Sequence, residues 1–154
     1  MIMDMFTERL VAKKWEASDI MKSVLCFVAA LAISLAAFVF AGYVAIIVLA
    51  ATLYGAYYLA TGFLFVEYEY TLTNEELNID KIIAKRKRVE LKTFNIKELS
   101  GGGKYDGRPA LMLCPDKASD NLYYLESSKE CVVIDPNETM LKAFSVYMGA
   151  NFVK

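Results

Sequence analysis

One uninterrupted apolar segment constrains this chain more than any other feature. From Ser23 to Val66 the sequence carries no charged residue, with Lys22 before the segment and Glu67 after it. A helix that spans a membrane needs about 20 apolar residues. A single helix of this length would be roughly twice as long as the hydrocarbon core of a bilayer is thick. The segment therefore predicts a hairpin of two antiparallel transmembrane helices.

The two helices are predicted to meet at a short turn. Gly42 relaxes the backbone and Tyr43 suits a membrane interface, so we expect a break at Ala41-Gly42-Tyr43. The transmembrane helices would then cover residues 23–40 and 44–66.

Small residues recur four positions apart within these helices, which lets helix backbones approach closely. The pairs are Ala32 and Ala36, Ala51 and Gly55, and Ala56 and Ala60. Two interpretations remain open: the pairs pack the two helices against each other, or they form the interface of a homo-oligomer.

Basic residues flank the apolar segment on one side only. They are Arg9, Lys13, Lys14 and Lys22 before it, and Lys81 and Lys85 to Arg88 after it. Such a bias places both termini in the cytoplasm and predicts a multi-pass protein of the plasma membrane. A cleaved signal peptide is the alternative, because Ala30-Leu31-Ala32 resembles a cleavage site. Acidic residues before the segment and its continuation past that site argue against cleavage.

The first 22 residues form a separate cytoplasmic segment in this interpretation. Phe6, Leu10 and Trp15 alternate with charged residues. Two structures are open for them: an amphipathic helix that lies along the membrane interface, or a frayed polar terminus.

Residues 67–154 predict a small, mostly β domain on the cytoplasmic side. Apolar and polar residues alternate from Val66 onward, which is typical of a half-buried strand. About six strands are expected, over residues 66–73, 77–84, 89–96, 110–114, 122–125 and 131–134. A change of phase after Val89 suggests a bulge, and Ser100 to Pro109 is expected to be a loop.

A C-terminal helix is predicted to close the domain. Asp135 is expected to cap it, Pro136 to take its first position, and Glu138 to complete a capping box. Gly149 is a plausible stop. The helix would bury an apolar stripe made of Met140, Leu141, Phe144, Tyr147 and Met148.

Antiparallel strands closed by one C-terminal helix resemble the pleckstrin-homology (PH) superfold. The resemblance rests on residues 66–74, on 76–80 and on the helix start at 135–138. The chain resembles bacterial PH-like families in which two transmembrane helices precede such a domain. This resemblance implies a binding or assembly module without catalysis. It does not imply phosphoinositide recognition, because the first hairpin loop contains Glu75 and Glu76, where lipid-binding PH domains carry basic residues.

The composition also argues against an enzyme. Histidine is absent, which removes Ser-His and Cys-His nucleophile pairs and the usual imidazole metal ligand. Cys26, Cys114 and Cys131 lack the spacing of a zinc site, and the last two are expected to be small buried hydrophobic residues. The net charge of −1 disfavours nucleic-acid binding. We expect no catalytic residue, no metal site and no cofactor.

The candidate site is the basic run Lys85, Arg86, Lys87 and Arg88. The first strand leads away from the bilayer and the second returns, so the run should lie at headgroup level beside the second helix. There it is expected to contact anionic lipids. The sequence thus predicts a non-enzymatic binding or scaffold module at the inner membrane face, with the bilayer and an unknown protein as partners. The alternative is an accessory subunit of a membrane complex that acts through its transmembrane helices.

Overall fold

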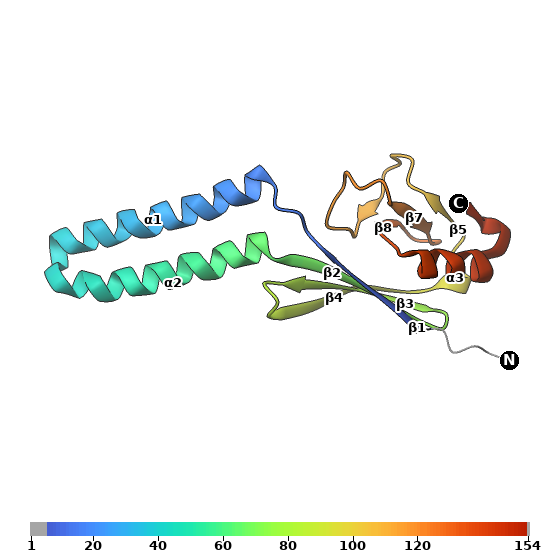
Figure 1. The fold of residues 1–154 in the computed structure, drawn as a ribbon, viewed down its shortest axis with the longest axis horizontal. Coiled ribbons are helices and arrows are strands. Elements are labelled where there is room, and N and C mark those ends of the chain that lie inside the picture. Colours follow the sequence, from blue (N-terminus) through green and yellow to red (C-terminus); the bar gives the residue numbers. More distant parts are fainter. Residues whose placement is uncertain (1–5, 154) are drawn as a thin grey trace.

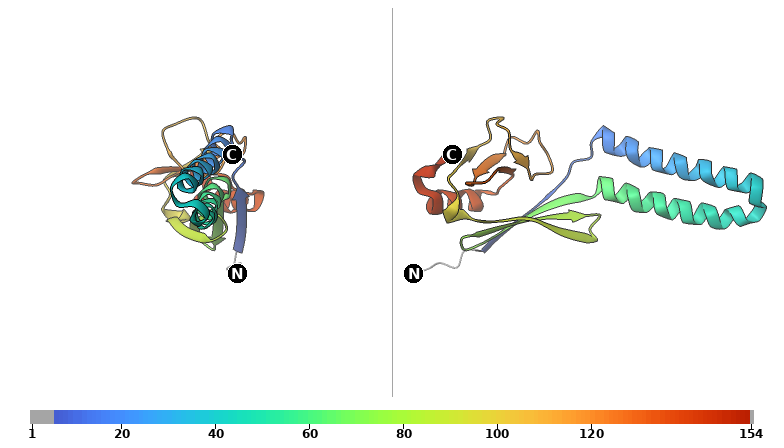
Figure 2. Two further views of the ribbon diagram at one scale, coloured as in Figure 1. Left: turned by 90° about the vertical axis from the view of Figure 1, so that its left-hand side faces the viewer. Right: turned by 180° about the vertical axis from the view of Figure 1, so that it is seen from behind.

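The computed structural model describes residues 6–153 and shows a long helix pair projecting from a domain of two sheets and a C-terminal helix. The helix pair consists of α1 (Ala17–Ala41) and α2 (Ala45–Leu64), joined by a short 3-10 turn, Gly42–Val44. Gly42 ends α1 with a φ of 55°, a left-handed conformation that glycine adopts without steric cost. The two helices lie side by side and extend away from the domain along one direction (Figures 1 and 2).

Small and polar side chains fill the contact between α1 and α2. Ala30 and Ser34 are buried on α1, and Ala56 and Ala60 are buried on α2. The hydroxyl oxygens of Ser34 and Thr52 lie 2.9 Å apart across the contact. Of the small-residue pairs singled out in the sequence, Ala56 and Ala60 therefore pack the two helices together. Ala32, Ala36 and Ala51 face outward instead.

Sheet A is antiparallel and adjoins the helix pair, which lies between its first two strands in the sequence. Its strand order is β1-β2-β3-β4, with bounds Phe6–Ala12, Val66–Thr73, Glu76–Ile83 and Lys87–Asn95. The predicted β2–β3 hairpin is present, and Asn74 takes a positive φ of 54° in its turn. The predicted bulge is present in β4, where Leu91 is the extra residue opposite Ile79 and Asp80.

Within the N-terminal segment, residues 6–12 form a strand, and for them both structures considered from the sequence are wrong. Residues 17–22 belong to α1, and residues 1–5 lie outside the described residues. β1 pairs with β2 along its whole length, from Phe6 opposite Thr73 to Ala12 opposite Glu67. Its side chains alternate in burial, with Thr7 buried between exposed neighbours. The open edge of β2 supplies backbone partners that a short N-terminal segment lacks by itself, and this non-local pairing decides its structure.

Sheet B is shorter and mixed. Its order is β6-β8-β7-β5-β9, with bounds Leu111–Met112, Cys131–Ile134, Tyr123–Glu126, Gly101–Lys104 and Phe152–Val153. The glycines of β5 were expected in a loop, and the structure corrects this. A Cβ on Gly102 would lie 2.9 Å from Phe152 Cδ2, so the missing side chain lets the sheet pack against the core.

The C-terminal helix α3 (Glu138–Met148) begins two residues later than predicted. Asn137, not Asp135, is the N-cap: its side-chain oxygen accepts a hydrogen bond of 2.8 Å from the Met140 amide. The helix ends at Gly149, as predicted, with a φ of 57°. A 3-10 turn, Gly149–Asn151, then leads into β9.

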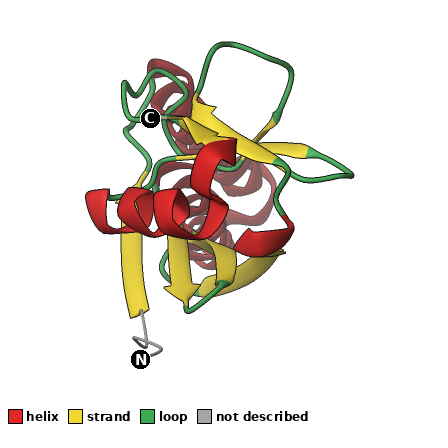
Figure 3. Ribbon diagram, turned by 90° about the vertical axis from the view of Figure 1, so that its right-hand side faces the viewer, coloured by secondary structure: helices red, strands yellow, loops and turns green. Residues whose placement is uncertain are grey.

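The main core lies where the two sheets and α3 meet, and α3 crosses the end of the domain that is remote from the helix pair (Figure 3). The predicted stripe of α3 contributes Met140, Phe144 and Met148 as buried residues, with Leu141 and Tyr147 partly buried. Tyr70 and Leu72 of β2 and Val132 and Ile134 of β8 face them from the sheets. Cys114 is buried and Cys131 half-buried, and all three cysteines are free.

Candidate binding surface at the base of the helix pair

The basic run begins in the turn between β3 and β4 and continues into β4, beside the end of α2, and Lys85 to Arg88 are called the basic turn below. The Ala84 amide donates a hydrogen bond of 2.6 Å to the Phe65 carbonyl, which ties the turn to the residue that follows α2. Ala84 and Lys85 both have positive φ, 54° and 55°, so this turn is held in an uncommon conformation for residues with side chains. The strand geometry therefore brings the run back to the base of the helix pair.

Arg86 is the residue of the run that docks on α2. Its guanidinium donates a hydrogen bond of 2.6 Å to Thr61 Oγ1 and a longer one of 3.4 Å to the Tyr58 carbonyl. The guanidinium carbon also lies 4.3 Å from the centroid of the Tyr58 ring, within the range of a cation–π contact. Arg86 thus fixes the turn against the helix rather than pointing freely into solvent.

The other three members of the run differ in how far their charge is already compensated. Arg88 pairs with Glu69 and lies 3.7 Å from Asp80. Lys85 Nζ lies 3.9 Å from Glu67 but its side chain is 69% exposed. Lys87 is exposed and has no ion pair within residues 6–153. Lys85 and Lys87 are therefore the charges available to a partner, whereas Arg86 and Arg88 are mainly engaged by the protein itself.

Aromatic side chains surround this surface. Trp15, just before α1, packs edge to face against Phe65, with 5.8 Å between the ring centroids, and its side chain remains 58% exposed. A groove of about 420 Å³ runs between α2 and the basic turn, lined by Tyr57, Thr61, Phe65, Ala84, Lys85 and Arg86. The base of the helix pair thus combines exposed aromatic rings with exposed cations.

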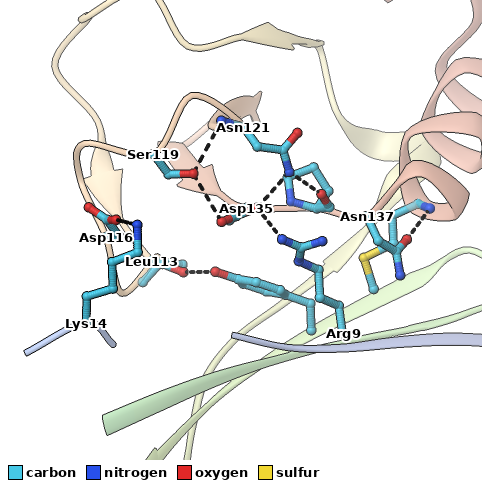
Figure 4. Close-up of polar contacts among 11 residues, drawn as sticks. Arg9, Lys14, Leu113, Asp116, Ser119, Asn121, Asp135 and Asn137 are labelled. Atoms are coloured by element: carbon cyan, nitrogen blue, oxygen red, sulfur yellow. Dashed lines mark hydrogen bonds and ion pairs between the residues drawn. The ribbon is translucent and has the colours of Figure 1, made fainter. Parts of the chain in front are cut away.

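A second polar cluster, centred on Asp135, joins the N-terminal strand to the segment before α3 (Figure 4). Arg9 Nη2 donates to Asp135 Oδ1 at 2.8 Å, and Asn121 Nδ2 donates to the same oxygen at 2.7 Å. Ser119 Oγ lies 3.4 Å from the other carboxylate oxygen. Asn121 also donates to the Pro136 carbonyl at 2.6 Å. Asp135 therefore organises a tertiary contact instead of capping the helix.

Neighbouring buried groups are held in their neutral forms. Tyr70 donates a hydrogen bond of 2.7 Å to the Leu113 carbonyl, and burial raises the pKa of its phenol. Burial, with the charges of Asp135 and Asp116, raises the pKa of the Cys114 thiol to about 11. A thiol with so high a pKa is a poor nucleophile near neutral pH. The Asp135 cluster is consequently a structural network.

Sequence reasoning missed Arg9, Ser119 and Asn121 as members of this network. Arg9 lies on the same face of β1 as Thr7 and Val11. The alternation of these residues with their exposed neighbours was the sequence signal for a strand with Arg9 on its inner face. Nothing local to Ser119 or Asn121 indicates that their side chains meet Asp135, because the contact depends on the tertiary path of the chain.

Comparison with known families assigns the part of the chain that runs as far as the loop after β5. Residues 3–108 match the family described as bacterial PH-like domain (DUF6106). The chain belongs to this family. The matched PH-like region includes β1, the helix pair, all of sheet A and β5. No curated protein and no solved structure matches the chain significantly.

Membership of a PH-like family suggests a binding or scaffold module. The PH-like chain also contains one helical stretch, Ala17–Leu64 with its internal turn, that is long and apolar enough to cross a membrane by length and composition. Few of the side chains in the most apolar part of this stretch are buried within the protein.

Proposed function

We propose that this protein is a non-catalytic binding module of the plasma membrane, in which α1 and α2 cross the bilayer and hold the PH-like domain at the inner face. It would be a multi-pass protein with both termini in the cytoplasm. Its proposed partners are anionic lipid headgroups at the basic turn and a protein that the domain recruits, with no cofactor.

The observation that carries this proposal is the packing of the helix pair, in which small and polar residues are buried and large apolar residues are exposed. The side chains buried between α1 and α2 are small or polar, as described above, while large apolar side chains point outward. Val39, Phe40 and Ile47 are 74%, 90% and 72% exposed. So much exposed apolar surface is unfavourable in water, whereas small residues inside and apolar residues outside are typical of helices packed in lipid.

The dimensions of the helices support the same proposal. A helix of 20 residues, such as α2, is about 30 Å long at 1.5 Å per residue, close to the thickness of the hydrocarbon core. Trp15 and Tyr58 lie near the base and Tyr43 at the far turn. Aromatic residues at both ends of a helix pair suit the two membrane interfaces.

The pairing of β1 with β2 supports a common side for the two termini. These strands flank the helix pair, so the chain enters and leaves it at the same end. That end carries Lys13, Lys14 and Lys22 and the basic turn, whereas the far turn, Gly42–Val44, carries no charge. The positive-inside bias favours the cytoplasm for the basic end.

An accessory subunit that acts through the helices is the second candidate. A shallow apolar groove of about 250 Å³ near the far turn favours it, because a neighbouring helix could pack there. The groove is lined by Leu31, Ser34, Leu35, Phe38, Ala45, Ile46 and Leu49.

Topology is tested by introducing one cysteine at the far turn, Tyr43→Cys, in the full chain with its native cysteines Cys26, Cys114 and Cys131 replaced by alanine. In intact cells a membrane-impermeant thiol reagent should label this position, and should label the exposed control Ser128→Cys only after the membrane is opened. The proposal would be contradicted if both positions were labelled in intact cells, or if neither were labelled after the membrane is opened.

The two candidate functions are separated by exchanging the helices. Because β1 belongs to the domain, the exchange must keep residues 1–16 and 65–154 and replace only what lies between them. Crosslinking in native membranes should retain the same partner if the PH-like domain recruits it. Loss of the partner with the helices would favour the accessory subunit.

A further inference from the structure

A separate cavity lies between the two sheets at the end of the domain that carries the helix pair. It has a volume of about 560 Å³. Lys13 and Glu16, in the segment between β1 and α1, form one side, and Tyr68 and Lys81 of sheet A form another. The third side is formed by β6 and its flanking segments, with Ala110, Leu111, Met112, Cys114, Pro115 and Lys117. This cavity is distinct from the basic turn, whose residues do not line it.

The charged side chains of the cavity are mostly cationic. Lys13, Lys81 and Lys117 line it, together with one acidic residue, Glu16. Lys13 already pairs with Asp19 at 2.5 Å. Lys81 lies over the Tyr68 ring, 5.9 Å from its centroid, and neither Lys81 nor Lys117 has an ion pair within residues 6–153. The cavity thus presents two ammonium groups that form no ion pair among the described residues, and its lining carries more positive than negative side chains.

The remaining lining is apolar and lies at the level where the helix pair meets the domain. It includes Val66, the first residue of β2, together with Ala110, Leu111 and Pro115. The Lys13 amide donates to the Val66 carbonyl at 2.8 Å, so the rim of the cavity is continuous with the base of the helices. Cations beside an apolar wall suit an anionic amphiphile better than a small inorganic ion alone.

We infer that this cavity binds the phosphate of an anionic headgroup, with Lys81 and Lys117 as its cationic ligands. A membrane lipid is the source we favour, and that source depends on the proposed membrane location. A water-soluble phosphate ester shares the same chemistry and is the other source.

The test uses the full chain in lipid nanodiscs, with Leu111→Cys as a reporter on the cavity wall. Leu111 is 47% exposed, so a thiol at this position is accessible in the empty cavity. Its rate of alkylation, resolved by peptide mass spectrometry, is compared in discs of phosphatidylcholine, in discs that also contain phosphatidylglycerol, and in phosphatidylcholine discs with added glycerol phosphate.

The charge variant is Lys81→Gln/Lys117→Gln, and its matched control is Lys129→Gln/Lys142→Gln. Lys129 and Lys142 are exposed, lie outside the cavity and have no ion pair within the described residues, so the control loses the same charge. Phosphatidylglycerol should slow alkylation in the parent chain and in the control. In the charge variant the apparent affinity for this lipid should be roughly tenfold weaker or more. Lys81→Arg/Lys117→Arg should retain the protection.

Protection by phosphatidylglycerol alone assigns the site to a lipid headgroup, and protection by glycerol phosphate assigns it to a soluble ester. Equal protection of the parent chain and the charge variant, or no protection by either compound, overturns the inference. Failure of the chain to enter nanodiscs would instead contradict the proposed function. The cavity would then be tested in detergent, by the effect of glycerol phosphate on the alkylation of Leu111→Cys.

Discussion

Arg9 and Asp135 form an ion pair of 2.8 Å although 126 residues separate them in the sequence. The contact joins β1, which precedes the helix pair, to Asp135, two residues before the cap of α3. The Asp135 side chain is 7% exposed, and the Arg9 side chain 30% exposed with its Nε buried and without a hydrogen-bond partner. The two ends of the chain are thereby held in one domain on the same side of the helices.

Removal of Arg9 alone should destabilise this domain strongly, since Arg9→Met leaves the buried Asp135 carboxylate with only Asn121 and Ser119. We expect a loss of about 2 to 4 kcal/mol in the free energy of unfolding. Chemical unfolding of the full chain in detergent measures it. The exposed pair Lys97–Glu75 provides the control: Lys97→Met should cost less than about 1 kcal/mol. Similar losses in both variants would show that Arg9 and Asp135 are not coupled.

The N-cap of α3 gives a second prediction. Asn137→Ala should cost about 0.5 to 2 kcal/mol, because the Met140 amide loses its side-chain acceptor. Hydrogen exchange at that amide should accelerate. Asp135→Ala should act on the contact with β1 and leave the Met140 amide protected. If exchange at the Met140 amide accelerates in Asp135→Ala but not in Asn137→Ala, Asp135 and not Asn137 caps the helix.

Glu69 makes stability depend on pH. Burial raises its pKa above the ordinary 4.5, and a hydrogen bond with Glu8 raises it further, while Arg88 opposes both. The folded state therefore binds the Glu69 proton more tightly than the unfolded state. Its contribution to stability is fully present below about pH 4.5 and is lost as pH rises through the raised pKa.

Glu69→Gln should accordingly become more stable relative to the parent chain as pH rises through this interval. Unfolding measured at a series of pH values gives that difference. Glu8→Gln should weaken the dependence, because it removes one cause of the raised pKa. A difference between Glu69→Gln and the parent that is constant with pH would contradict the assignment.

The basic turn gives a fourth prediction, on the domain without its helices. Because the Lys13 amide bonds to the Val66 carbonyl, a short Gly-Ser linker can replace residues 17–64 and keep β1 in place. Lys85→Gln/Lys87→Gln should weaken sedimentation of this domain with anionic vesicles by roughly tenfold or more, from the loss of two exposed positive charges. Lys129→Gln/Lys142→Gln should bind like the parent. Equal binding by both double variants at low salt would exclude the turn as the contact.

The sequence by itself determined the elements whose signal is local. The uncharged segment predicted the two helices after Ser23, and the alternation of apolar and polar residues from Val66 predicted the β2–β3 hairpin. The apolar stripe and Gly149 predicted the buried face and the end of α3, whereas its start was predicted two residues too early. Each of these patterns repeats within one element, so neighbouring residues are enough to specify the structure.

Tertiary structure alone decided β1, β5 and the role of Asp135. β1 is a strand because β2 offers it an edge. Gly101–Lys104 is a strand because it pairs with β7 and β9, and the neighbours approach too closely for a Cβ at Gly102 or Gly103. Asp135 has the residue type expected of a cap, but its carboxylate accepts hydrogen bonds from Arg9 and Asn121 instead of from the helix. Such contacts join residues far apart in the chain, and local periodicity carries no information about them.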